Sequence, residues 1–130
     1  MSAGRRTVEE LLAEARARVQ PISPETAAAE LEQGAILVDI RAESQRAADG
    51  SIPGAVVVAR NVLEWRCDPD CEARDERLAD LNARLIVMCD AGYQSSLAAA
   101  TLHDIGLRRA TDLAGGFQAW RAAGLPVDPA

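Results

Sequence analysis

The chain has 130 residues and a formal net charge of −6; apolar residues make up 48% of it and aromatic residues only 3%. This length suits one domain with a core of small aliphatic side chains and is too short for two ordinary domains. Because acidic and basic residues are interspersed, we expect neither nucleic acid nor an anionic membrane as a partner. The charged N-terminal segment has the pattern of neither a signal peptide nor a spanning helix. We therefore expect a soluble, cytoplasmic protein.

The first predicted element is a helix from Thr7 to Val19, which Pro21 ends. The apolar residues that share one helical face are Val8, Leu11, Leu12, Ala15 and Val19. We treat residues 1–22 as an N-terminal helical extension of the chain. Its apolar stripe must cover either the rest of the chain or a second copy of it, and both a monomer and a homodimer agree with the sequence.

A second helix is predicted from Pro24 to Gln33, because Ser23 is a typical N-cap and Gly34 a typical C-terminal cap. Short apolar runs then alternate with helical stretches. The apolar runs are Ala35 to Ile40, Ala55 to Ala59, Leu85 to Cys89 and Ala110 to Ala114. The helical stretches are Ala42 to Asp49, Asn61 to about Asp80 with a break near Pro69, Ser95 to Ile105, and Gly116 to Ala123.

The four apolar runs are continuous rather than alternating. Strands of that kind are covered by helices on both faces. Residues 23–130 are therefore expected to form one α/β domain with a central, mostly parallel sheet flanked by helices.

Cys89 follows directly after one of the predicted strands, at the edge where open parallel sheets bind ligands. The residues after it form a short loop with a flexible Gly92, and Ser95 is suited to cap the next helix. Such a loop can turn successive N–H groups inward, which favours a thiolate and makes Cys89 a candidate nucleophile. A lone cysteine at the end of an apolar strand is otherwise usually an inert core residue.

Three blocks of the sequence are LVDIR (Leu37 to Arg41) with SIPGAVVV (Ser51 to Val58), CDAGYQSSLAAATLHDIG (Cys89 to Gly106) and DLAGGFQAWRAAGLPV (Asp112 to Val127). Through these blocks, the chain from about Ser23 to Val127 resembles the single-domain rhodanese family of thiosulfate sulfurtransferases. The last block is the most specific, because its Gly-Gly-Phe-x-x-Trp followed by Gly-Leu-Pro is typical of this family. The resemblance implies a rhodanese-like three-layer domain with an added N-terminal helix.

By this resemblance, Cys89 takes sulfane sulfur from thiosulfate or a persulfide, becomes a persulfide itself, and passes the sulfur to a thiophilic acceptor. The acceptor is a small molecule or a protein thiol. The resemblance implies no metal and no organic cofactor. The active loop that would bind substrate consists of Asp90, Ala91, Gly92, Tyr93, Gln94 and Ser95.

The loop departs from the family pattern at its last residue, where many members carry an arginine and this chain has Gln94. An amide supplies no charge, so the affinity for dianionic thiosulfate should fall. Arg41 and Arg60 each follow a predicted strand and could provide an anion-binding cation at the same edge. The alternative is that both are ordinary solvated or ion-paired arginines.

Cys67 and Cys71 flank a short Asp-Pro-Asp segment, and their role is open. Two thiols do not complete a zinc site, which needs four ligands. They are either incidental loop cysteines, or they act as a local redox pair or as a resolving thiol for Cys89.

Two other functions compete with sulfur transfer. Phosphatases share a thiolate in an anion-binding loop, but they need an arginine six residues after the cysteine, where this chain has Ser95. The second competitor is a non-catalytic module of the same fold that binds a partner or senses redox state.

Overall fold

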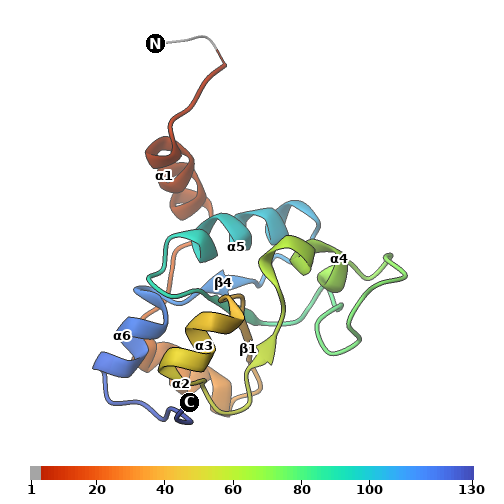
Figure 1. The fold of residues 1–130 in the computed structure, drawn as a ribbon. Coiled ribbons are helices and arrows are strands. Elements are labelled where there is room, and N and C mark those ends of the chain that lie inside the picture. Colours follow the sequence, from red (N-terminus) through yellow and green to blue (C-terminus); the bar gives the residue numbers. More distant parts are fainter. Residues whose placement is uncertain (1–3) are drawn as a thin grey trace.

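Four parallel strands form a single sheet in the computed structural model, which describes residues 4–130 (Figure 1). The strands are β1 (Ile36–Asp39), β2 (Val56–Val57), β3 (Leu85–Met88) and β4 (Thr111–Asp112), and their order across the sheet is β2-β1-β3-β4. In the central pair, Ile36 lies opposite Leu85 and Asp39 lies opposite Met88. All carboxyl ends therefore meet at one edge. The predicted α/β fold with a parallel sheet is confirmed, although each strand is shorter than its apolar run.

Helices connect the strands and precede them. They are α1 (Val8–Arg18), α2 (Pro24–Glu32), α3 (Glu43–Asp49), the 3-10 helix η1 (Arg60–Val62), α4 (Leu63–Cys67), α5 (Gln94–Asp104) and α6 (Gly116–Ala122). Local sequence explains where the first two begin. The Thr7 hydroxyl accepts the N–H of Glu10, whose carboxylate accepts the N–H of Thr7 in return. At α2 the Ser23 hydroxyl accepts the N–H of Thr26, and Pro24 is in the first turn.

Each face of the sheet has its own apolar core, because successive strand residues point to opposite sides. Val87 belongs to a cluster with α4 and α5, whereas its neighbour Ile86 belongs to a cluster with α2 and α6. The first cluster includes Cys89 and Cys67, and the second is filled by Phe117 and Trp120. The sheet is therefore the middle of three layers, as the resemblance implied.

Helix α1 packs against α5, and its Ala15 and Val19 are buried there (Figure 1). The second half of its apolar stripe thus covers the same chain, in agreement with one of the two alternatives. Val8 and Leu11, in the first half of the helix, stay exposed. No helix among residues 4–130 has the length and apolar character needed to cross a membrane.

The prediction of helix from Asn61 to about Asp80 is wrong for its second half. Helix α4 ends at Cys67, and turns follow up to β3. The cause is a repeated local bond, in which the carboxylates of Asp68, Asp75 and Asp80 each accept the backbone N–H two residues further on. Such Asx turns offer the backbone a partner that competes with the helical one.

Candidate active site

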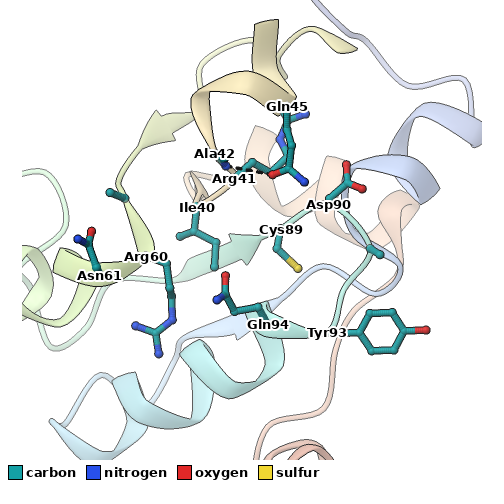
Figure 2. Close-up of a pocket in the computed structure, with 12 residues that line it drawn as sticks. Ile40, Arg41, Ala42, Gln45, Arg60, Asn61, Cys89, Asp90, Tyr93 and Gln94 are labelled. Atoms are coloured by element: carbon teal, nitrogen blue, oxygen red, sulfur yellow. Dashed lines mark hydrogen bonds between the residues drawn. The ribbon is translucent and has the colours of Figure 1, made fainter. Parts of the chain in front are cut away.

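Cys89 comes directly after β3 and lines a pocket at the carboxyl edge of the sheet (Figure 2). The side chain is 7% exposed. Its Sγ accepts the backbone N–H of Gly92 at 3.2 Å and that of Ser95 at 3.4 Å. These bonds come from the middle and the end of the loop, which therefore curls around the sulfur. Donors of this kind favour the thiolate over the thiol.

The start of α6 holds the loop from the other side. The N–H of Phe117 donates to the Cys89 carbonyl at 2.9 Å, and that of Gln118 donates to the Asp90 carbonyl at 3.1 Å. Gly116 makes this approach possible: its φ is +62°, and a Cβ there would lie 2.4 Å from the Cys89 carbonyl oxygen. The Gly-Gly-Phe sequence therefore orients the carbonyls of the loop toward α6.

Beneath the loop lies the buried carboxyl of Asp112, at the end of β4. One of its oxygens accepts the hydroxyls of Ser95 and Ser96, each at 2.8 Å. Burial raises the pKa of Asp112, while the two hydroxyl bonds and the charge of Arg16 act in the opposite direction. The prediction that Ser95 caps α5 is wrong, because the helix begins at Gln94 without a side-chain cap and the Ser95 hydroxyl donates to Asp112 instead.

The pocket beside Cys89 has a volume of about 510 Å³. Most of the predicted site residues line it, namely Cys89, Asp90, Ala91, Tyr93, Gln94, Arg41 and Arg60. Gly92 and Ser95 instead contact the sulfur through their N–H groups. Figure 2 shows the Gln94 amide beside Cys89 and the Tyr93 ring directed away from it. Tyr93 is 63% exposed and belongs to the rim.

Arg41 reaches the predicted edge, but its charge is already neutralised. Its guanidinium donates to both oxygens of Asp39, at 3.1 and 2.9 Å, and both side chains are 0% exposed. It also donates to the Gly50 carbonyl and stacks on the Phe117 ring, 4.0 Å from the centroid. Arg41 is therefore a buried group that joins the end of β1 to the end of α3 through Asp39 and Gly50, rather than a solvated surface group.

Arg60 is also paired. Its guanidinium lies 2.9 Å from both carboxylate oxygens of Glu64, one helical turn further along the chain. The pair is partly buried at the pocket wall. Each arginine that lines the pocket thus has a carboxylate partner.

Cys67 and Cys71 differ from Cys89 in their surroundings. All three are free thiols. Cys67 is 0% exposed, and burial, followed by the negative charges of Glu64 and Asp75, raises its pKa to about 12. Cys71 is half-buried in the turns that follow. Among residues 4–130, no group of three or more histidine, cysteine, aspartate or glutamate side chains is placed to hold a metal ion.

Two residues of the site, Asp112 and Arg16, are not among those predicted from the sequence. Asp112 stands inside an apolar run, where a buried carboxyl is unusual, and that was the available signal. Arg16 donates from α1 to the Gly92 carbonyl. An arginine on an amphipathic helix is normally read as a solvated group, so nothing in the sequence marks it.

The fold and site together define an α/β domain that presents a cysteine in a loop of backbone donors. The family model described as "Rhodanese-like domain" matches residues 23–123. The chain therefore belongs to the rhodanese-like domain family.

Curated relatives include two proteins named thiosulfate sulfurtransferase GlpE. The protein from Pseudomonas fluorescens is 42% identical over 101 residues, covering 77% of this chain and 83% of that protein. The protein from Haemophilus influenzae is 34% identical over 110 residues, covering 84% and 94%.

Solved structures agree on the fold. A protein from Rhodopseudomonas palustris, described as of unknown function and a possible tyrosine phosphatase, is 30% identical with a TM-score of 0.87, covering 98% of each chain. A thiosulfate sulfurtransferase from Pseudomonas aeruginosa is 29% identical with a TM-score of 0.68 over 85% of this chain and 19% of that one. The first match extends over nearly the whole chain, beyond the part matched by the family model.

Proposed function

We propose that this protein transfers sulfane sulfur through a persulfide on Cys89. The observation that carries the proposal is the pair of N–H groups that donate to Sγ beside a pocket. Within residues 4–130, the N–H groups of Ala91, Tyr93 and Gln94 have no intramolecular acceptor. They are available to a sulfur or oxyanion attached to Cys89.

The coarser assignment follows from the family and from the curated relatives: the chain is a rhodanese-type sulfurtransferase. Its substrates are accordingly a small sulfur donor and a small sulfur acceptor. We further propose that residues 23–130 form the catalytic domain and residues 1–22 its helical extension, with a protein thiol as a further possible acceptor. The sequence agrees with both a monomer and a homodimer, and we propose neither.

The reaction proceeds by two displacements at sulfur. The Cys89 thiolate attacks the outer sulfur of the donor, a new S–S bond forms, and the donor's own bond to that sulfur breaks. The leaving group carries away the electron pair, as sulfite from thiosulfate or as a thiolate from an organic persulfide. An acceptor thiolate or cyanide then attacks the outer sulfur and releases the Cys89 thiolate. The two steps need no metal, redox cofactor or external base.

The charges of the pocket favour an organic persulfide over thiosulfate as the donor. Arg41 and Arg60 are both neutralised by carboxylates, and Gln94 is uncharged. Asp90, whose carboxylate accepts a hydrogen bond from the Gln118 amide, also lines the pocket. Thiosulfate carries two negative charges on the group that reacts and would enter without an unpaired cation from these residues, whereas the persulfide group of an organic donor carries at most one.

The decisive experiment is intact-mass analysis after incubation with glutathione persulfide or thiosulfate, followed by peptide mapping. We expect one added sulfur on Cys89 with either donor, reached faster with the persulfide. Cys89→Ser should stay folded and acquire no sulfur. If neither donor adds sulfur to Cys89, or if Cys89→Ser still transfers sulfur, the proposal is wrong. A disulfide formed with peroxide in place of a persulfide would point to the redox-sensing module.

Two further arms test the donor and the phosphatase alternative. Gln94→Arg should raise the efficiency with thiosulfate by roughly tenfold, because it restores a cation beside the sulfur, and should change the persulfide reaction little. Gln94→Met is the matched variant without charge and should show no such gain. An equal gain with both donors would contradict the charge argument. Hydrolysis of p-nitrophenyl phosphate that depends on Cys89 would favour the phosphatase alternative.

A further inference from the structure

We infer that Arg16, on the N-terminal helix α1, is a positioning residue of the active loop. The inference rests on the proposed role of Cys89 as the nucleophile. It would make α1 part of the catalytic unit, although the family model matches only from residue 23 onward.

Arg16 makes two hydrogen bonds that converge on the loop and the start of α5. Its Nη2 donates to the Gly92 carbonyl at 2.9 Å, and its Nε donates to the Ser96 hydroxyl at 3.2 Å. The guanidinium also lies 5.7 Å from the centroid of the Tyr93 ring. One planar group thus contacts three residues of the segment that follows Cys89.

The residue that Arg16 holds is also one that contacts the sulfur. Gly92 donates its N–H to Cys89 Sγ and offers its carbonyl to Arg16. On its other side Gly92 packs closely against Gly115, because a Cβ at Gly92 would lie 2.7 Å from the Gly115 nitrogen. The loop is therefore clamped between α1 and the turn that begins α6.

A second path runs through the hydroxyls under the loop. The Ser96 hydroxyl accepts from Arg16 and donates to Asp112, which also accepts from the Ser95 hydroxyl. The Ser95 N–H is the other donor to Cys89 Sγ. Both N–H groups that hold the sulfur are thus connected to Arg16, each through one or a few hydrogen bonds.

The charge of Arg16 distinguishes it from the arginines that line the pocket. Arg41 and Arg60 each have a carboxylate partner, whereas the ion pairs found within residues 4–130 include none with Arg16. Its charge is therefore not neutralised by a direct partner in that range. A cation bonded to the loop backbone favours the thiolate and a persulfide anion. Arg16 thereby compensates in part for the charge that Gln94 lacks.

Helix α1 also offers a matched control. Arg18 donates from the same helix to the Ala100 carbonyl and to Asp104 on α5, away from the loop. Arg16→Met removes the guanidinium that joins α1 to the loop and the first turn of α5, and Arg18→Met removes the one that joins α1 to the later part of α5. Only the first should affect Cys89.

The test measures the rate of Cys89 alkylation by iodoacetamide across pH, mapped by mass spectrometry, together with sulfur transfer and thermal unfolding. We expect Arg16→Met to slow alkylation at neutral pH by about three- to tenfold, the size expected for one lost hydrogen bond. The pH profile should move to higher pH, transfer should fall by a similar factor, and Arg16→Lys should recover part of both. Arg18→Met should leave the alkylation profile unchanged.

Identical alkylation profiles for Arg16→Met and Arg18→Met would overturn the inference, as would a profile for Arg16→Met equal to that of the unmodified protein. Alkylation needs only a reactive thiolate and no sulfur donor. A wild-type protein that carries no persulfide would therefore refute the proposed function, while the alkylation comparison would still decide the role of Arg16.

Discussion

Cys89 and Cys67 belong to the same apolar cluster on one face of the sheet, and both are buried. Their immediate surroundings are opposite. Backbone N–H groups point at the sulfur of Cys89, whereas the carboxylates of Glu64 and Asp75 act on Cys67. Burial alone disfavours a thiolate. The comparison shows that the donors around a thiol, rather than its depth, separate a candidate nucleophile from a core cysteine.

The two regions also differ in what shapes their backbone. The loop after Cys89 is held by distant elements, with α6 on one side and α1 on the other. The segment after Cys67 is held mainly by its own aspartates, each bonded two residues ahead. A loop that is held by contacts with other elements keeps its backbone N–H groups free to point at the sulfur. A segment that is held by its own side chains uses its N–H groups in those local hydrogen bonds.

The largest expected effect comes from removing the support of the loop at Gly116. In Gly116→Ala the new methyl would meet the Cys89 carbonyl, at a φ that side chains rarely adopt. We expect the free energy of unfolding to fall by at least about 2 kcal/mol and sulfur transfer to fall close to background, because the loop must move. Urea unfolding and steady-state transfer measure the two effects.

Gly124 supplies the control, since its φ is +75° but no atom lies within 4 Å of a Cβ there. Gly124→Ala should cost about 1 kcal/mol from backbone strain and leave transfer unchanged. If the two variants transfer sulfur equally well, contact between α6 and the loop does not set the position of Cys89.

A second prediction compares the three thiols directly. In the folded protein, iodoacetamide should modify Cys89 and Cys71 but leave Cys67 unmodified, because the Cys67 thiol is buried and its pKa is raised to about 12. Under denaturing conditions all three should react. Peptide mapping of partly alkylated protein gives the order in which the three thiols react. Modification of Cys67 in the native state at a rate near that of Cys89 would remove the contrast between the regions.

The smallest effect concerns the buried carboxyl under the loop. Because the pKa of Asp112 is raised above its ordinary value of 3.8, the folded state binds this proton more tightly than the unfolded state. The stability from this group is fully present below that ordinary value and is lost as pH rises through the raised pKa. Asp112→Asn keeps an acceptor for Ser95 and Ser96 but removes the titration.

The measurement is urea unfolding of both proteins in a pH series that starts near 3.8 and rises to neutral. The stability of the wild type relative to Asp112→Asn should fall as pH rises through the raised pKa of Asp112 and then level off. Other carboxylates titrate equally in both proteins and cancel in the difference. A difference that does not change with pH would show that the hydroxyl donors and Arg16 fully offset the burial of this carboxyl.

The strands and the position of Cys89 could be predicted because continuous apolar runs mark buried strands, and carboxyl ends of parallel strands share one edge. The turns after Pro69, where a helix is predicted, could not be foreseen, because apolar spacing does not report competition from aspartate side chains. The burial of the Asp39–Arg41 pair could not be predicted either, since two charged residues at the end of a strand are equally compatible with a position on the surface. The hydrogen bonds from Arg16 to the loop depend on how α1 packs against α5, and the local sequence pattern does not determine that packing.

The Asp39–Arg41 pair has a consequence for how the protein responds to salt. Mobile ions weaken pairs that they can approach, such as Arg6 with Glu14, whose side chains are 57% and 51% exposed. They cannot approach a pair with no exposed surface. The Asp39–Arg41 ion pair at the carboxyl edge of the sheet should therefore persist at high ionic strength. A change in turnover with added salt would then report on encounters with charged substrates and on exposed contacts, not on loosening of the Asp39–Arg41 ion pair.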